Sequence, residues 1–226
     1  MLKFPEILFE DYYLAVLHKP AGLMVEDDGF GNPSVQQWML QHLQKKFPEH
    51  KTYFIGFPHR LDRVTEGLLL VAKTKSALTA LNKQFENKTV RKIYHALIHQ
   101  PLRHASGTLR HYHKKDVKLK KAMISLKPRE GFSPCELKYE TIVSNKTTYS
   151  LLKIELLTGR YHQIRAQLSF EKSPVVGDLF YGSDIENGKN RIALAATELL
   201  FHHPKSNELM LFELDWQKIF SGFLSK

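Results

Sequence analysis

The sequence is poor in cysteine. Its 226 residues include a single one, Cys135, which excludes a disulfide framework within the chain and any structural zinc site built from cysteines. Scarce cysteine is typical of proteins that work in a reducing compartment, and we therefore expect the protein to be cytoplasmic.

Long apolar runs are also missing. Residues 1–20 are interrupted by Pro5, Glu6, Glu10 and Asp11, so they contain no apolar stretch of the kind found in signal peptides. No later run approaches the roughly 20 apolar residues with which a helix crosses a bilayer. We therefore expect neither export nor a place in a membrane.

Acidic residues are outnumbered by basic ones. Lysine and arginine total 33 against 23 aspartates and glutamates, which gives a formal net charge of +10. Such an excess says more about partners than about the fold, and a nucleic-acid backbone is the commonest polyanion that would bind it. A basic surface that serves only solubility is the alternative.

The 12 histidines lack the spacing of a metal site. His111 and His113 stand two apart and His202 and His203 are adjacent, but neither pair has a third ligand at a suitable distance along the chain. We expect these side chains to lie on strand surfaces or to contact a nucleic acid, and we expect no metal.

No segment rich in proline, glycine and serine divides the chain, so we expect one domain over residues 1–226. Seven runs are strand-like, and several alternate apolar and polar residues, as strands of a sheet with one solvated face do. These runs are residues 7–9, 14–17, 68–71, 93–98, 137–143, 149–157 and 209–214.

Three segments have helical spacing of apolar residues. Asn32 and Pro33 are typical of a cap and a first turn, for a helix that ends before Pro48. Thr74 is expected to cap a second helix, and a third is expected to begin near Thr158. Helices beside a mainly antiparallel, mixed sheet indicate an α+β fold.

The most informative stretch is residues 58–73, PHRLDRVTEGLLLVAK. Asp62 stands between Arg60 and Arg63 in a polar turn that leads straight into the apolar run 68–71. Such a run predicts a buried strand, so Asp62 should lie on a loop held by a rigid scaffold, where chemistry is commonly placed. The alternative is an ordinary surface ion pair with one of the two arginines.

His59 to Asp62, with Thr65 and Gly67, resemble the H-R-L-D-x-x-T-S-G signature of the RluA-type RNA pseudouridine synthases. Other blocks of the chain resemble the same family and occur in the family's order over about nine tenths of the sequence. They are residues 19–23 (KPAGL), 91–96 (RKIYHA), 158–165 (TGRYHQIR), 174–178 (PVVGD), 181–182 (YG), 191–194 (RIAL) and 203–204 (HP).

The resemblance implies the pseudouridine synthase fold with a central RNA-binding cleft, and an isomerase that converts uridines of structured RNA to pseudouridine. The bond from ribose C1′ to uracil N1 breaks, the base turns, and C5 is joined to C1′ instead. No hydride, phosphate or oxidant takes part, so no cofactor is expected. The family's frequent S4 domain has no counterpart here, which implies a minimal, single catalytic domain over residues 1–226 that acts as a monomer.

Three residues occupy the positions of the family's catalytic groups. The resemblance makes Asp62 the carboxylate that attacks the sugar or assists loss of its 2′ proton, two routes that the sequence leaves open. Arg165 would pair with that carboxylate and keep it ionised. Tyr94 would stack on the target base near C5. Without the resemblance, Arg165 is a surface residue of a helix and Tyr94 a core aromatic.

The remaining candidates are expected to bind RNA. An enzyme that acts at C1′ and C5 must turn the nucleotide out of the stack, and Arg60, with His59 beside it, is expected to fill the gap. Residues expected to line the RNA path are Lys19, Arg160 and His162. Lysines of a hairpin between residues 107 and 128 are expected to reach the RNA, or else to form a solvated surface. They are Lys118, Lys120 and Lys121.

The match to the family has departures. Glu66 stands where the family usually has serine, Ala195 replaces a frequent histidine, and Gln167 stands where histidine or glutamine occurs. None of them is a catalytic candidate, so they concern the choice of substrate more than the reaction.

Two other functions are compatible with parts of the sequence. A non-catalytic RNA-binding protein or RNA-folding chaperone on the same scaffold would account for the charge, and a hydrolytic glycosylase would use a similar carboxylate. A zinc deaminase is excluded because its metal site needs more than one cysteine. The target uridine, in ribosomal or transfer RNA, is not specified by the sequence.

Overall fold

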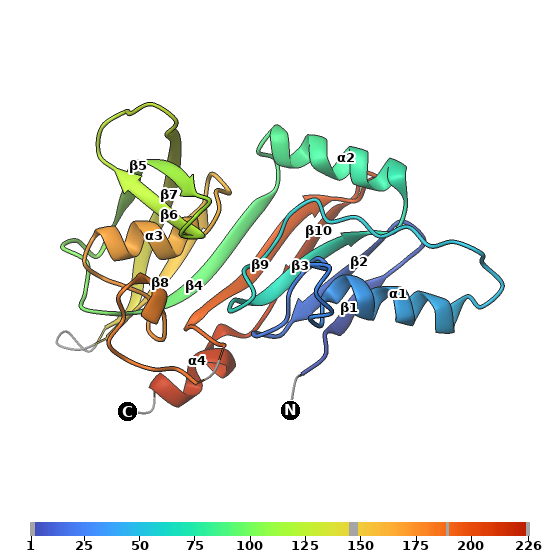
Figure 1. Ribbon diagram of the computed structural model, residues 1–226, viewed down its shortest axis with the longest axis horizontal. Helices are drawn as coiled ribbons and strands as arrows, with labels where there is room; N and C mark the ends of the chain where they lie inside the picture. Colours follow the sequence, from blue (N-terminus) through green and yellow to red (C-terminus); the bar gives the residue numbers. More distant parts are fainter. Residues whose placement is uncertain (1–2, 145–148, 189, 225–226) are drawn as a thin grey trace. The chain divides into compact units, whose positions relative to one another are not determined.

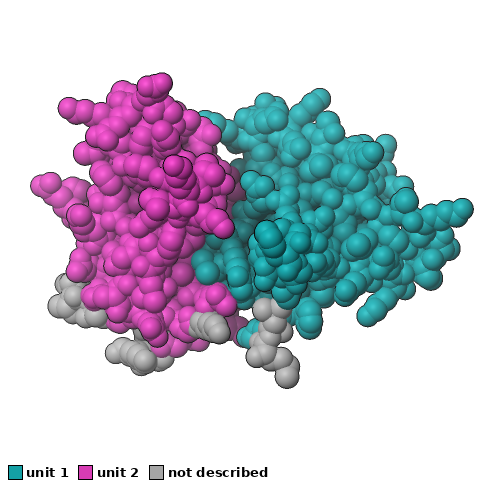
Figure 2. All heavy atoms as spheres, viewed as in Figure 1, with its two compact units in different colours: residues 1–90, 198–214 teal, residues 91–197, 215–226 magenta. Residues whose placement is uncertain are grey.

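The computed structural model describes residues 3–144, 149–188 and 190–224, and it carries ten strands and four α-helices in that part of the chain (Figure 1). The chain divides into two compact units (Figure 2). Unit 1 comprises residues 1–90 and 198–214, and unit 2 comprises residues 91–197 and 215–226. The boundary between units falls inside strand β9 (Leu194–His202). The α+β class is confirmed.

Unit 1 is built on strands β1 (Glu6–Glu10), β2 (Leu14–Lys19) and β3 (Glu66–Ala72), with β10 (Leu209–Glu213) beside the second part of β9. The pairings β1–β2, β2–β3 and β9–β10 are antiparallel. β3 is an almost continuous apolar run because it is buried on both faces, as expected from the sequence.

Two helices belong to unit 1, α1 (Val35–Lys46) and α2 (Lys75–Glu86). The predicted cap Thr74 is confirmed, since its side chain accepts a hydrogen bond from the amide of Ala77. The predicted cap of α1 is wrong by two residues. Ser34 rather than Asn32 caps that helix, because its hydroxyl accepts from the amide of Gln37.

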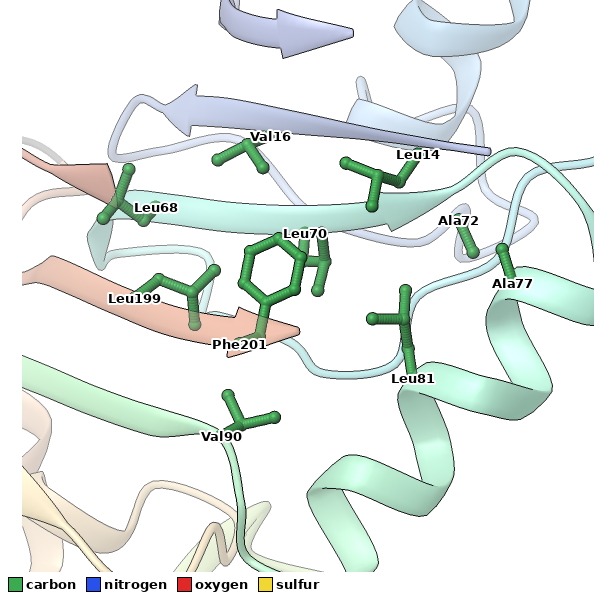
Figure 3. Close-up of a cluster of buried hydrophobic side chains, with 10 residues drawn as sticks. All are labelled: Leu14, Val16, Leu68, Leu70, Ala72, Ala77, Leu81, Val90, Leu199 and Phe201. Atoms are coloured by element: carbon green, nitrogen blue, oxygen red, sulfur yellow. The ribbon is translucent and has the colours of Figure 1, made fainter. Parts of the chain in front are cut away.

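The core of unit 1 lies between α2 and the strands (Figure 3). Leu81 of α2 points from the helix toward the strands, and Ala77 lies beside Ala72 at the end of β3 (Figure 3). Each fully buried leucine or phenylalanine contributes about 1.5–3 kcal/mol through removal of its surface from water. This core holds β3 in place, and the loop that precedes β3 is therefore attached to a rigid strand.

Unit 2 contains five antiparallel strands in the order β4, β8, β7, β5, β6. Their bounds are β4 (Arg91–His99), β5 (Ser106–Asp116), β6 (Lys121–Ser125), β7 (Ser133–Ser144) and β8 (Tyr149–Leu156). Each of the seven strand-like runs corresponds to a strand, although the runs 149–157 and 209–214 extend one residue beyond β8 and β10. The hairpin expected between residues 107 and 128 is formed by β5 and β6.

Three helical segments complete unit 2: α3 (Gln163–Phe170), the single 3-10 turn η1 (Leu179–Tyr181) and α4 (Trp216–Leu224). α3 begins five residues after the predicted start at Thr158, and it contacts β5 and β6. In the part of the chain that the structure describes, no helix has both the length and the apolarity needed to cross a membrane. The prediction of one domain over residues 1–226 stays a prediction.

Candidate active site

Asp62 lies in a tight turn that leads directly into β3. The amide of Thr65 donates to the main-chain carbonyl of Asp62 at 3.0 Å, and β3 begins one residue later, at Glu66. Leu61 is buried beside it, whereas Asp62 itself is half-buried. The predicted place of Asp62, on a loop that runs into a buried strand, is confirmed. Residues 59–65 are called the Asp62 loop below.

A second turn holds the Asp62 loop through main-chain atoms. The amide of Gly22 donates to the carbonyl of Arg63 at 2.7 Å, and the Nε of Arg63 donates back to the carbonyl of Gly22 at 3.1 Å. Gly22 has a φ of +89°, a conformation that glycine adopts without a steric penalty. The two turns are therefore locked together where β2 and β3 end their pairing, at Lys19 and Gly67.

Lys19 is fully buried beneath these turns. Its Nζ donates to the carbonyls of Pro20 and Leu23, both at 2.9 Å, and to that of Arg63 at 3.4 Å. Its ammonium is thus enclosed by carbonyl oxygens and reaches RNA only if the turn opens. The structure gives Lys19 a place different from the predicted RNA path, that of a residue that positions the Asp62 loop.

Burial also sets the charge state of this lysine. Desolvation lowers the pKa of Lys19 to about 7, against the opposing effect of the negative charges of Asp62 and Glu66. A change of charge near neutral pH at this position would alter the electrostatic field at Asp62 directly, since the two groups interact.

His59 and Arg60 differ in how they are placed. Nε2 of His59 accepts a hydrogen bond from the amide of Leu70 at 3.0 Å, and its ring stacks on Phe85 of α2 at 5.2 Å. The imidazole thereby fixes the loop to β3 and α2.

Arg60 is 70% exposed and pairs with Glu26 at 2.9 Å. An exposed pair of this kind is worth only about 0–1 kcal/mol, so Arg60 can exchange Glu26 for a phosphate or a base.

Tyr94 lies in the middle of β4, in unit 2. Its side chain is 7% exposed, and it stands opposite Ile154 of β8. A strand position with this much burial fixes the direction of the ring, which suits a stacking role better than a role that needs movement. The role of Tyr94 toward a base stays a prediction.

Arg165 has a carboxylate partner in its own unit, Asp178. Its Nε donates to Oδ2 of Asp178 at 2.7 Å and its Nη2 to Oδ1 at 2.9 Å, and the two side chains are 6% and 1% exposed. The ring of Tyr181 lies 4.9 Å from the guanidinium carbon. Asp62 and Arg165 belong to different units, and the pairing predicted between them stays a prediction.

The sequence reasoning missed Asp178. It stood in the block 174–178, which resembles the family, but no role followed from a lone aspartate after a glycine. The structure shows why it is in reach of α3: residues Val175 and Val176 lie along β4, with the amide of Val176 donating to the carbonyl of Leu97 at 2.9 Å. Asp178 follows them and is held under Arg165.

Buried amide side chains fix the start of α3. Oε1 of Gln163 accepts from the hydroxyl of Thr158 at 2.8 Å and from the amide of Arg160 at 3.0 Å. Its Nε2 donates to Oε1 of Gln167 at 2.9 Å, and Gln167 in turn contacts Nδ1 of His111 at 2.9 Å. This network holds the TGRYHQIR segment in one conformation, and with it Arg165.

The two other basic residues of that segment are placed differently. Arg160 is exposed, as a contact with RNA requires. His162 is partly buried, with a left-handed φ of +52°, and its ring stacks on Tyr161 at 3.7 Å. Burial, assisted by the charge of Arg165, lowers the pKa of His162 to about 3. His162 is therefore neutral near pH 7, and its contact with RNA stays a prediction.

The lysine run lies on the β5–β6 hairpin, as predicted. Lys118 and Lys120 are exposed, and Lys121 lies over two aromatic rings, those of Phe180 at 5.3 Å and Tyr181 at 5.1 Å. Contact of these lysines with RNA stays a prediction. Among the described residues, no group of three or more histidine, cysteine, aspartate or glutamate side chains is placed to hold a metal ion.

A family model described as RNA pseudouridylate synthase matches residues 13–170. An uncharacterized RNA pseudouridine synthase of Mycoplasma pneumoniae is 36% identical over 97% of this chain and 69% of its own length. The dual-specificity RNA pseudouridine synthase RluA of Vibrio vulnificus is 31% identical over 90% of this chain and 80% of its own length. The tRNA pseudouridine synthase C of Vibrio cholerae is 27% identical over 98% and 95%.

Solved structures agree on the fold. Human RNA pseudouridylate synthase domain containing 4 superposes with a TM-score of 0.78 at 21% identity, covering 97% of this chain and 91% of its own. Human RNA pseudouridylate synthase domain containing 1 gives a TM-score of 0.73 at 24% identity, covering 96% and 85%. The predicted fold and family are confirmed, and the findings favour the enzyme over a non-catalytic RNA-binding protein. The chain belongs to the RluA-type RNA pseudouridine synthases, isomerases that convert uridine in RNA to pseudouridine.

Proposed function

We propose that this enzyme modifies specific uridines of transfer RNA, large-subunit ribosomal RNA or both, as a monomer in the cytoplasm, with Asp62 as its catalytic carboxylate. The observation that carries the proposal is the construction of the Asp62 loop. It is anchored by main-chain hydrogen bonds to the turn of Gly22 and by the buried Lys19, and it leads directly into β3. A fixed carboxylate at the end of a buried strand suits covalent or electrostatic catalysis at a sugar carbon.

The reaction requires no group from outside the chain and its substrate. The C1′–N1 bond of the uridine breaks, the freed base turns, a C5–C1′ bond forms, and the proton at C5 leaves while N1 gains one. Asp62 stabilises C1′ or attacks it, and Tyr94 supports the turning base. Arg165, held in place by Asp178, supplies a fixed positive charge, since an arginine stays protonated at any working pH.

Arg60 is proposed to take the space of the extruded nucleotide. Its side chain is 70% exposed, lies two residues from Asp62 and forms an exposed pair with Glu26. A planar guanidinium can stack on bases and pair with phosphates, so the same residue can serve both before and after the nucleotide turns out.

The target class is proposed from the names of the relatives. One relative is a tRNA pseudouridine synthase C, another a ribosomal large subunit pseudouridine synthase C of Buchnera aphidicola, and a third a dual-specificity enzyme. This chain spans 95% of the first and 69% of the second. The names of these relatives include both classes of RNA, and we propose both as targets.

Pseudouridine mapping in a deletion strain tests the proposal. Total RNA from the parent, from the deletion strain, and from the deletion strain carrying the wild-type gene or the Asp62→Asn variant would be mapped side by side. We expect one or a few sites to vanish on deletion, to return with the wild-type gene and to stay absent with the variant. Identical maps in all four strains, or restoration by Asp62→Asn, would contradict it.

A further inference from the structure

The turn η1 presents two large apolar side chains to solvent. Phe180 is 48% exposed and Leu179 is 56% exposed, whereas the third residue of the turn, Tyr181, is 4% exposed. The reaction assigned above uses neither exposed residue. A half-exposed phenylalanine on a fixed turn is a surface that a flat apolar partner can cover.

The turn is held on both sides by buried bonds. On one side Asp178 is fixed by its two bonds to Arg165. On the other, the hydroxyl of Tyr181 accepts from the amide of Ala122 at 2.7 Å and contacts Nδ1 of His162 at 3.1 Å. Phe180 is therefore presented by a turn that loses little backbone freedom when something binds to it.

A lysine lies beside the Phe180 ring, and a second lies over a neighbouring aromatic ring. Nζ of Lys121 lies 5.3 Å from the centre of the Phe180 ring, and Nζ of Lys115 lies 4.5 Å from that of Tyr161. Both lysines come from the β5–β6 hairpin, which also carries the exposed Lys118 and Lys120. Lysines interleaved with exposed aromatic rings are the combination by which proteins hold unpaired nucleic-acid strands, the rings stacking on bases and the lysines meeting phosphates.

We infer that Phe180 stacks on an unpaired base of the substrate RNA while Lys121 meets the adjacent phosphate. This inference rests on the proposed function, since it takes RNA as the substrate. Phe180 is a positioning residue: it holds a nucleotide outside the reacting one. Because the turn begins directly after Asp178, the stacked base is fixed relative to the carboxylate that orients Arg165.

The inference fixes the class of RNA that binds best. A base can stack on Phe180 only if it is not already stacked within a duplex, so a stem-loop should bind better than a continuous duplex of equal length and charge. The lysines attract both RNAs equally, because their contact with phosphates does not depend on base pairing. Phe180 should therefore account for the difference between the two.

The test compares fluorescein-labelled RNAs, a stem-loop with an unpaired pyrimidine-rich loop and a fully paired duplex, by anisotropy at one salt concentration. Phe180→Ala should weaken binding to the stem-loop by about 5- to 100-fold and binding to the duplex by less than about 2-fold. Phe180→Trp should bind the stem-loop as the wild type does. Leu179→Ala, a matched change in the same turn, should leave both affinities within about 2-fold of wild type.

Thermal unfolding of each variant separates a loss of RNA binding from a loss of structure. If Phe180→Ala does not fold, Phe180→Leu takes its place, because leucine keeps the apolar volume but has no flat ring. Equal stem-loop affinities for wild type and Phe180→Ala, or equal losses on stem-loop and duplex, would overturn the inference. Pseudouridine formation by the wild type is measured in the same preparations. Its absence on every RNA would overturn the proposed function, whereas the stacking result is read from binding alone.

Discussion

The Asp62 loop in unit 1 and the Arg165 site in unit 2 are fixed by different means. Several bonds of the Asp62 loop end on main-chain carbonyls: that of Asp62 accepts from Thr65, and that of Arg63 accepts from Gly22 and Lys19. The side chain of His59 adds a bond to the amide of Leu70. Arg165 is instead held through its own functional group, by two bonds to the carboxylate of Asp178.

The two sites therefore predict different responses to substitution. The main-chain bonds of the Asp62 loop do not depend on which side chain stands at position 62. A change at Arg165 or Asp178 instead removes two hydrogen bonds between buried, oppositely charged groups.

The largest expected effect is the loss of Asp178. Asp178→Asn should lower the free energy of unfolding by about 3–5 kcal/mol, because it removes the carboxylate charge that pairs with the buried Arg165 at 2.7 Å. Urea unfolding measures it. The double variant with Arg165→Met should recover part of the loss, since neither buried charge then remains.

Two results would contradict the prediction for Asp178. A loss below about 1 kcal/mol in Asp178→Asn would mean that solvent or another group replaces the carboxylate at no cost. Additive losses in the double-mutant cycle would mean that Arg165 and Asp178 are energetically independent despite two hydrogen bonds.

The second prediction concerns Lys19 and pH. The pKa of Lys19 is lowered to about 7 in the folded chain, so between about pH 7 and its ordinary pKa of 10.5 the unfolded chain binds more protons. Stability attributable to Lys19 should therefore rise as pH increases through this window, by about 2 kcal/mol between pH 7 and pH 9.

The contribution of Lys19 is obtained by subtracting the unfolding free energies of two proteins. Unfolding free energies of the wild type and of Lys19→Met would be measured at both pH values, and all groups that titrate alike in the two proteins cancel. The wild type should gain stability relative to the variant at pH 9. A difference independent of pH would show that the three carbonyl oxygens keep Lys19 charged throughout, and that burial does not shift its titration.

The third and smallest expected effect is that of the hairpin lysines on salt dependence. Changing three of them to glutamine should flatten the plot of log affinity against log salt by roughly 0.7–0.9 for each lost phosphate contact. The triple variant changes Lys118, Lys120 and Lys121. The matched control changes three exposed lysines of α2 and the turn after it, Lys75, Lys83 and Lys88.

An RNA titration at several salt concentrations reads out both triple variants. The control variant should show the same slope of log affinity against log salt as the wild type if the lysine–phosphate contacts come from unit 2 alone. Equal slopes for the wild type and the hairpin variant would mean that these lysines form a solvated surface and do not contact RNA phosphates.

Local sequence was sufficient for much of the fold. Apolar runs with clear alternation, such as that of β8, and the cap Thr74 depend on neighbours in the chain, and both were predicted. The motif around Asp62 was placed correctly because its position before a buried strand is itself a local property.

Features decided by distant residues were not predictable. β9 (Leu194–His202) is rich in leucine and alanine, which favour helices, and its pairing with β10 overrides that preference. The role of Asp178 depends on Arg165, 13 residues away, with no spacing rule to connect them. Lys19 looked like a solvated base because nothing local indicates that its turn closes over the ammonium.

The central claim is that Asp62 is the catalytic carboxylate, carried on a loop that main-chain bonds hold to the turn of Gly22. Asp62→Asn tests it most directly, by measuring tritium release from C5-labelled uridine RNA and RNA affinity on one preparation, with urea unfolding to show that the variant is folded. We predict no detectable release and an RNA affinity close to that of the wild type. Release at a rate comparable with that of the wild type would contradict the claim.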